Sequence, residues 1–87
     1  MKWKLSTAAK KDLRKLDPPI AKLILDTLET TPFRKGSADV KKLRGHKNRY
    51  RLRIGDWRVI FRHDNERNAL VVLVLRIRHR RGAYRDS

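Results

Sequence analysis

Residues 50–61 constrain the fold more than any other part of this chain, because their side chains alternate around a two-residue turn, Gly55-Asp56. A Gly-led pair between two alternating runs is a strong signal for a β-hairpin with a primed turn. This turn places Ile54 opposite Trp57 and fixes every pair further along the hairpin. Successive side chains of a strand point to opposite faces of a sheet. One face of the predicted hairpin is apolar and consists of Tyr50, Leu52, Ile54, Trp57, Val59 and Phe61. The other face carries five arginines, Arg49, Arg51, Arg53, Arg58 and Arg62.

The five arginines require a compensating anion or extensive hydration. The predicted register sets Arg53 opposite Arg58 and Arg49 opposite Arg62, and like charges placed directly across a ladder are destabilising. An ordinary solvated sheet face accounts for the alternation, but not for the lack of Glu, Asp or Thr among the arginines. Arginine binds phosphate bidentately and stays charged at any working pH. The pattern therefore favours a site for a polyphosphate.

The overall charge also indicates a polyanionic partner. The 87 residues carry 24 Lys and Arg against 9 Asp and Glu, a net charge of +15. Residues 41–87 hold 15 of the basic and 4 of the acidic side chains, so the charge gathers where the hairpin lies. The chain has no cysteine, which excludes disulfides and thiolate metal sites and fits a cytoplasmic location. No apolar leader or membrane-length run is present, and we expect a soluble protein with no membrane partner.

The rest of the sequence predicts one α+β domain over residues 1–87. A short edge strand contains Trp3 and Leu5, and Ser6 or Thr7 can cap the helix that follows. Asp17-Pro18-Pro19 ends that helix and starts a second one, whose predicted buried stripe is Ile20, Leu23, Ile24 and Leu28. Residues 34–39 read as a loop, and Asp64-Asn65 as a polar turn after the hairpin. The apolar run over residues 69–77 is typical of a central strand, with Val71, Leu73, Leu75 and Ile77 expected to meet the helices. The expected fold is an antiparallel sheet of about four strands packed against an N-terminal α-helical hairpin, in the order β-α-α-β-β-β.

Several pieces of the sequence, taken in order, match one known pattern. They are the helical hairpin, the segment Lys42-Leu43-Arg44-Gly45, the arginine hairpin at residues 50–61 and the basic ending at residues 78–85. In this order the chain resembles the RelE/ParE toxins of bacterial and archaeal toxin-antitoxin systems. The resemblance implies that the chain is either like the RelE branch, which cleaves messenger RNA in the ribosomal A site, or like the ParE branch, which acts on DNA gyrase and is not a nuclease.

RelE-type chemistry makes demands that the side chains of this sequence can meet. Metal-free RNA cleavage uses the neighbouring 2′-hydroxyl as nucleophile, so the protein helps to remove its proton, stabilises the phosphorane and protonates the leaving 5′-oxygen. The chain offers many arginines, His79 and Tyr84, and no carboxylate cluster suited to a metal. We therefore expect neither a metal nor a cofactor.

The resemblance also assigns roles to single residues. It implies catalytic roles for Arg58, Arg80 and Tyr84, the last by stacking on a base or moving a proton. Arg51 and Arg53 match paired basic positions where well-known relatives carry lysine, and because arginine does not readily lose a proton they are better phosphate ligands than bases. His79 is the obvious substitute base, since histidine titrates near neutral pH, although a solvated surface histidine is the alternative. We expect His46 and His63 to be solvated. Further RNA phosphate ligands are predicted to be Arg49, Arg62, Arg78 and Arg81.

Two functions of different classes remain open at this point. The first is a ribosome-dependent messenger RNA endonuclease toxin, a monomer when alone, whose partners are a cognate acidic antitoxin, the 70S ribosome and messenger RNA. The second is a non-enzymatic chain, either a ParE-like toxin acting on gyrase or a basic nucleic-acid-binding module. The ending discriminates between them, because an arginine followed four residues later by a tyrosine, as in Arg80 and Tyr84, is the set that the RelE branch uses for chemistry.

Overall fold

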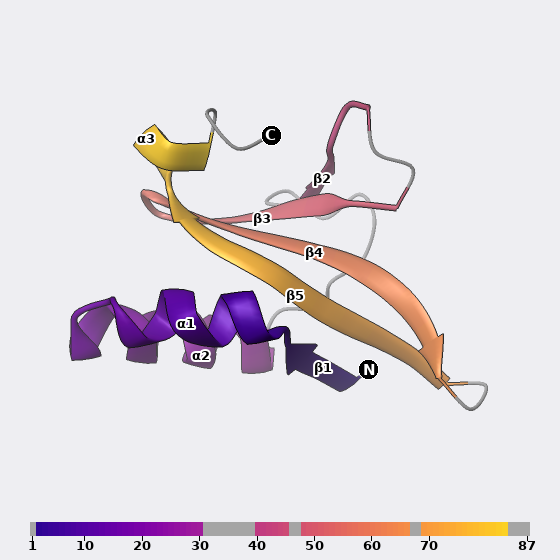
Figure 1. Cartoon of the computed structure of the whole chain (residues 1–87), viewed down its shortest axis with the longest axis horizontal. Coiled ribbons are helices and arrows are strands. Elements are labelled where there is room, and N and C mark those ends of the chain that lie inside the picture. The colour runs from indigo at the N-terminus through magenta and orange to yellow at the C-terminus, as the bar shows by residue number, and fades with distance from the viewer. Residues whose placement is uncertain (1, 31–39, 46–47, 67–68, 84–87) are drawn as a thin grey trace.

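The structure, a computed structural model, describes residues 2–30, 40–45, 48–66 and 69–83. Strand β1 (Lys2–Leu5) leads into two helices, α1 (Thr7–Arg14) and α2 (Pro18–Thr30). Strands β2 (Val40–Lys42), β3 (Tyr50–Ile54), β4 (Trp57–Glu66) and β5 (Ala69–His79) follow, and the chain then enters a short helix, α3 (Arg80–Ala83). Figure 1 shows α1 and α2 on one side of the sheet and α3 on the other. The expected loop at residues 34–39, His46 and Tyr84 lie outside the described residues.

The strands form one five-stranded sheet in the order β1-β5-β4-β3-β2. Strand β1 runs parallel to β5, and the other three pairings are antiparallel. The predicted α+β class, with the helical hairpin against the sheet, is confirmed. The sheet is mixed rather than purely antiparallel, and β2 adds a short strand beyond the four expected.

Both helices begin where their capping residues predict. The hydroxyl of Ser6 accepts a hydrogen bond from the backbone N–H of Ala9 at the start of α1. The carbonyl of Asp17 accepts the first two backbone bonds of α2, from Ile20 and Ala21. A proline at the first helical position is tolerated because its missing N–H would have had no partner within the helix. The sequence therefore fixes where each helix of the α-hairpin begins.

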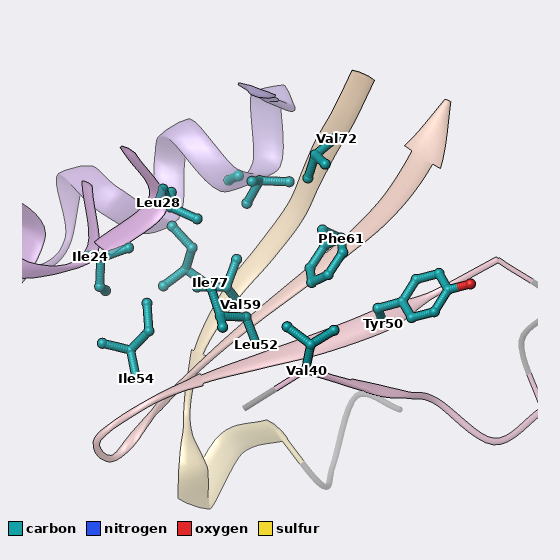
Figure 2. Close-up of a cluster of buried hydrophobic side chains, with 12 residues drawn as sticks. Ile24, Leu28, Val40, Tyr50, Leu52, Ile54, Val59, Phe61, Val72 and Ile77 are labelled. Atoms are coloured by element: carbon teal, nitrogen blue, oxygen red, sulfur yellow. The ribbon is translucent and has the colours of Figure 1, made fainter. Parts of the chain in front are cut away.

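The arginine hairpin has the predicted register from Tyr50 opposite Phe61 to Ile54 opposite Trp57. Gly55 has φ of 57°, the left-handed conformation that the first position of a primed turn requires. The apolar face of the hairpin forms the core with α2, as Figure 2 shows for Leu52, Val59 and Ile24. Leu23 is an exception on the helix, because it is 51% exposed and does not belong to the buried stripe.

Strand β5 contains a bulge that changes which of its side chains face the core. Ile60 pairs with Arg76 but Phe61 pairs with Val74, so Leu75 is an extra residue in β5. Val72 and Val74 are fully buried before the bulge, and Ile77 is buried after it. The prediction that Leu73 and Leu75 meet the helices is therefore wrong, because the strand changes phase between Val74 and Ile77.

Strand β4 is longer than the sequence indicated. It continues through the predicted Asp64-Asn65 turn to Glu66, which pairs with Ala69. The side chain of His63 consequently does not lie in a solvated loop, and the prediction made for it is wrong. Its ring lies 4.9 Å from that of Tyr50 and 5.7 Å from that of Phe61, measured between ring centroids.

Candidate functional site

Basic side chains form two rows across the strands on the face of the sheet turned away from the core. In the first row, Arg58 in the middle strand β4 pairs with Arg53 of β3 on one side and with Arg78 of β5 on the other. In the second row, Arg51 pairs with Lys41 of β2 and with Ile60 of β4, and Ile60 pairs with Arg76 of β5. Directly paired residues share a face, so these side chains stand side by side. Arg62, two residues after Ile60 in β4, lies on the same face. We call the whole set the arginine face and define it as Lys41, Arg51, Arg53, Arg58, Arg62, Arg76 and Arg78.

Arg58 lies at the centre of the first row and is buried, with only 6% of its surface exposed. Its Nη1 donates to the carbonyl oxygens of Gly55 at 3.3 Å and Trp57 at 3.2 Å. Among the described residues it has no ion pair with a carboxylate. A basic side chain on the outer face of a hairpin is expected to be exposed, and for Arg58 this expectation is wrong, because the side chain is buried. The buried guanidinium of Arg58 has two long hydrogen bonds to neutral acceptors, so a bound anion would stabilise it.

The other members of the arginine face differ in how their charge is compensated. Arg76 forms an ion pair with Asp12 of α1 through two hydrogen bonds of 3.0 and 3.2 Å, and Arg62 pairs with Asp64 at 3.1 Å. The Nε of Arg51 is buried without a hydrogen-bond partner among the described residues. A buried donor of this kind calls for an explanation, and an anion that binds between the rows would provide one. Within the part of the chain that the structure describes, the uncompensated part of the face is therefore centred on Arg51 and Arg58.

Helix α3 adds two arginines beside the end of the hairpin. The backbone N–H of Arg80 donates to the carbonyl of Asp56 at 2.6 Å, which ties the start of α3 to the β3–β4 turn. The guanidinium of Arg80 is 61% exposed and lies 3.8 Å from the Asp56 carboxylate, also exposed, so the pair is weak and open to exchange with another anion. Arg81 is exposed as well. These two residues extend the positive surface beyond the strands.

His79 does not lie on the arginine face. It pairs with Trp57, whereas Arg78 pairs with Arg58, and the two pairs point to opposite sides of the sheet. The rings of His79 and Trp57 meet edge to face, 5.1 Å apart. The structure thus brings together Arg51, Arg53, Arg58, Arg62 and Arg78 but leaves His79 on the other side. Arg49 is exposed just before β3.

Sequence reasoning missed two basic members of the second row and one acidic neighbour. Neither Lys41 nor Arg76 is among the phosphate ligands that the sequence predicts. Lys41 could have been found by extending the hairpin register to the flanking strand, whereas the place of Arg76 depends on the bulge in β5. Asp12, whose partner Arg76 is 64 positions away, has no local signal. No group of three His, Cys, Asp or Glu side chains suited to a metal exists within the described ranges.

The described helices include none that is long and apolar enough to cross a membrane.

The fold and the arginine face together define a small α+β protein with a cationic sheet surface suited to an anionic partner. Arginines at neighbouring register positions can contact adjacent oxygens of one phosphate or successive phosphates of a chain.

Comparison with known proteins identifies the family. The family model of the ParE toxin of type II toxin-antitoxin systems, parDE, matches residues 3–84. A Methanocaldococcus jannaschii protein named "Putative toxin RelE1" is 35% identical over 81 residues, which cover 87% of this chain and 86% of that protein. The chain therefore belongs to the RelE/ParE family of toxins of type II toxin-antitoxin systems.

Solved structures agree with this assignment. The toxin-antitoxin complex RelBE2 from Mycobacterium tuberculosis contains a chain with 26% sequence identity and a TM-score of 0.74, and the match covers 91% of this chain and 96% of that one. The archaeal RelE-RelB complex from Pyrococcus horikoshii contains a chain with 30% identity and a TM-score of 0.65, covering 91% and 93%. The family model has the ParE name whereas these relatives have RelE names, so the names do not decide the cellular target.

Proposed function

We propose that this toxin is a ribosome-dependent endoribonuclease that cuts messenger RNA in the A site and thereby inhibits translation. The observation that carries the proposal is the first row of the arginine face. There a buried Arg58, with no carboxylate partner among the described residues, stands between Arg53 and Arg78. Such a row provides the fixed positive charge that a phosphorane needs, and Arg58 at its centre is shielded from water. The 30% and 35% identity to proteins named RelE supports the same branch.

The proposed reaction uses the RNA as its own nucleophile. The 2′-oxygen attacks the adjacent phosphorus, a 2′-O–P bond forms, and the P–O5′ bond breaks. The products end in a 2′,3′-cyclic phosphate and a 5′-hydroxyl, and the proton lost by the 2′-oxygen is balanced by the one that the 5′-oxygen gains. Arg58 and Arg80 would stabilise the charge that develops on the phosphorane, and Arg51, Arg53 and Arg78 would hold the flanking phosphates.

The proton transfers need groups other than these arginines, which do not readily deprotonate. His79 shares a face with Trp57 and would have to turn around the end of β5 to reach the row. We therefore propose that the proton at the 2′-oxygen is moved by Tyr84 or by a group of the ribosomal RNA rather than by His79.

A cognate antitoxin is the proposed protein partner. The similar chains from Mycobacterium tuberculosis and Pyrococcus horikoshii were solved in complexes with their antitoxins. A net charge of +15 favours an acidic partner, and a disordered segment that folds on binding could cover the arginine face. We propose that the free toxin is cytoplasmic and monomeric.

A second function, inhibition of DNA gyrase without nuclease activity, is favoured by one observation, the match of the ParE family model to residues 3–84. Both functions are tested by one pair of assays on the purified toxin. Translating ribosomes are incubated with the toxin and the message is analysed by primer extension, while gyrase supercoiling is followed in parallel. Cuts inside the A-site codon with unaffected supercoiling support the proposal. An intact message with inhibited gyrase would establish the second function instead.

A further inference from the structure

The bulge at Leu75 decides on which face the arginines of β5 lie. Val72 and Val74 are buried against the core, and in a regular strand Arg76 and Arg78 would share their face. Continuing the register from the Phe61–Val74 pair without a bulge would set Arg76 opposite Val59 and Arg78 opposite Trp57. The extra residue moves both arginines to the other side, where Arg78 pairs with Arg58.

The bulge occurs just after the pairing between β5 and β1 ends. Strand β1 pairs with residues 71–74 of β5 and ends at Leu5, so no strand of the described residues pairs on that side with β5 beyond Val74. Two side chains take the place of the strand. The hydroxyl of Ser6 donates to the carbonyl of Leu75 at 2.9 Å, and the carboxylate of Asp12 accepts from the backbone N–H of Ile77 at 2.9 Å.

Asp12 holds both the backbone and a side chain of the bulged segment. Its Oδ2 accepts from Nε of Arg76 at 3.0 Å as well as from the Ile77 N–H, and its Oδ1 accepts from Nη2 of Arg76 at 3.2 Å. The side chain of Asp12 is only 10% exposed, so water is a poor substitute for these bonds. Hydrogen bonds to a carboxylate are among the stronger ones in proteins.

We propose that Asp12 is a positioning residue for the arginine face: by fastening the β5 bulge to α1, it keeps Arg78 beside Arg58. The consequence for RNA rests on the function proposed above, whereas the fastening of the bulge stands independently of it. In this role Asp12 does not contact the substrate itself but acts by keeping Arg76 and Arg78 of β5 on the arginine face.

The structural part is tested by NMR on the full chain. In the wild type, cross-strand contacts join Val59 to Ile77 and Arg58 to Arg78. In Asp12→Ala we expect both contacts to weaken and the Ile77 amide to exchange with solvent about tenfold faster or more, because its charged acceptor is gone. Asp12→Asn keeps an oxygen that can accept from the Ile77 N–H but loses the ion pair with Arg76. Its Ile77 exchange rate should therefore lie between those of the wild type and Asp12→Ala. Asp26→Ala, which removes an exposed carboxylate on α2, is the control with the same change in charge.

The functional part uses a single-stranded oligouridylate as the RNA probe. If Arg78 leaves the arginine face in Asp12→Ala, the slope of log affinity against log salt should become shallower by about 0.7, as in Arg78→Ala. Between 50 and 200 mM salt this is about a 2.6-fold smaller loss of affinity. Adding Arg78→Ala to Asp12→Ala should then change nothing further. A protein that is merely less stable would still show the full effect of Arg78→Ala.

Three results would overturn the proposal. The first is that the Val59–Ile77 and Arg58–Arg78 contacts are unchanged in Asp12→Ala. The second is that Arg78→Ala has the same effect on the salt slope in the wild type and in Asp12→Ala. The third applies if Asp12→Ala does not fold, and it is an Asp12→Asn protein that matches Asp26→Ala in Ile77 exchange and salt slope. A wild-type chain that binds neither RNA nor ribosomes contradicts the proposed function, and the NMR contacts still decide the role of Asp12.

Discussion

Replacing Arg58 with methionine should remove catalysis while leaving the fold nearly as stable as before. Methionine keeps an unbranched apolar stem of similar length, so the buried volume beside the hairpin end remains filled. The substitution removes only the guanidinium, with its hydrogen bonds to the carbonyls of Gly55 and Trp57.

The opposing contributions to the free energy of unfolding are similar in size. Two hydrogen bonds are lost, and at 3.2 and 3.3 Å they are long, so each contributes at the lower end of about 0.5–1.5 kcal/mol. Two like-charge neighbours across the ladder, Arg53 and Arg78, lose their repulsion, at about 0.2–1 kcal/mol each. We expect a net change within about 1 kcal/mol, or a shift in Tm of no more than about 4–8 °C. Loss of one preorganised group that stabilises the transition state lowers kcat by about 10²–10³.

Thermal unfolding by circular dichroism and cleavage on translating ribosomes measure the two quantities separately. Arg58→Ala is the companion variant, and it should be less stable than Arg58→Met because the buried stem is also lost. Full cleavage by Arg58→Met would refute the assignment of the site. A destabilisation of more than about 3 kcal/mol would show that Arg58 serves the fold instead, because that is a large part of the stability of a small domain.

Three other outcomes are expected. Arg80→Ala should abolish growth inhibition and change stability by less than about 0.5 kcal/mol, since its ion pair with Asp56 is exposed; a toxic Arg80→Ala strain would remove Arg80 from the site. His79→Ala should cleave with the wild-type pH profile, because its ring lies beside Trp57 on the other face, and a lost rise in rate near neutral pH would restore the histidine as base. Ribosome or RNA binding should show a salt slope of about −3 if four arginines contact phosphate, with a slope near zero as the contradicting result.

Much of the fold was readable from local patterns. The Gly55-Asp56 turn determined the register of the hairpin and therefore its two faces, because a tight turn leaves no freedom to slip. Ser6 marked the start of α1 through its capping side chain, and Asp17-Pro18-Pro19 marked the start of α2. The face on which His79 lies was also predictable, because His79 shares parity with Ile77 rather than with Arg78.

The remaining features depend on contacts between distant parts of the chain. Residues 71–75 are apolar at every position, so alternation permits either phase for β5. Ser6 and Asp12 contact the segment just after Val74, and neither has a local signal for this role. The burial of Arg58 was equally hidden, because alternation assigns a side chain to a face but does not say what encloses it.

The most direct test of the central claim, that the arginine face promotes attack by the RNA's own 2′-hydroxyl, is cleavage of a message with a single 2′-deoxynucleotide at the scissile position of the A-site codon. Translating ribosomes programmed with this message and with the all-ribose message are treated with the toxin under identical conditions, and the products are mapped by primer extension. The proposed function predicts a cut in the all-ribose message, an upstream fragment ending in a 2′,3′-cyclic phosphate, and no cut at the deoxy position. Equal cleavage of both messages would contradict it, because the attacking oxygen would then have to come from elsewhere.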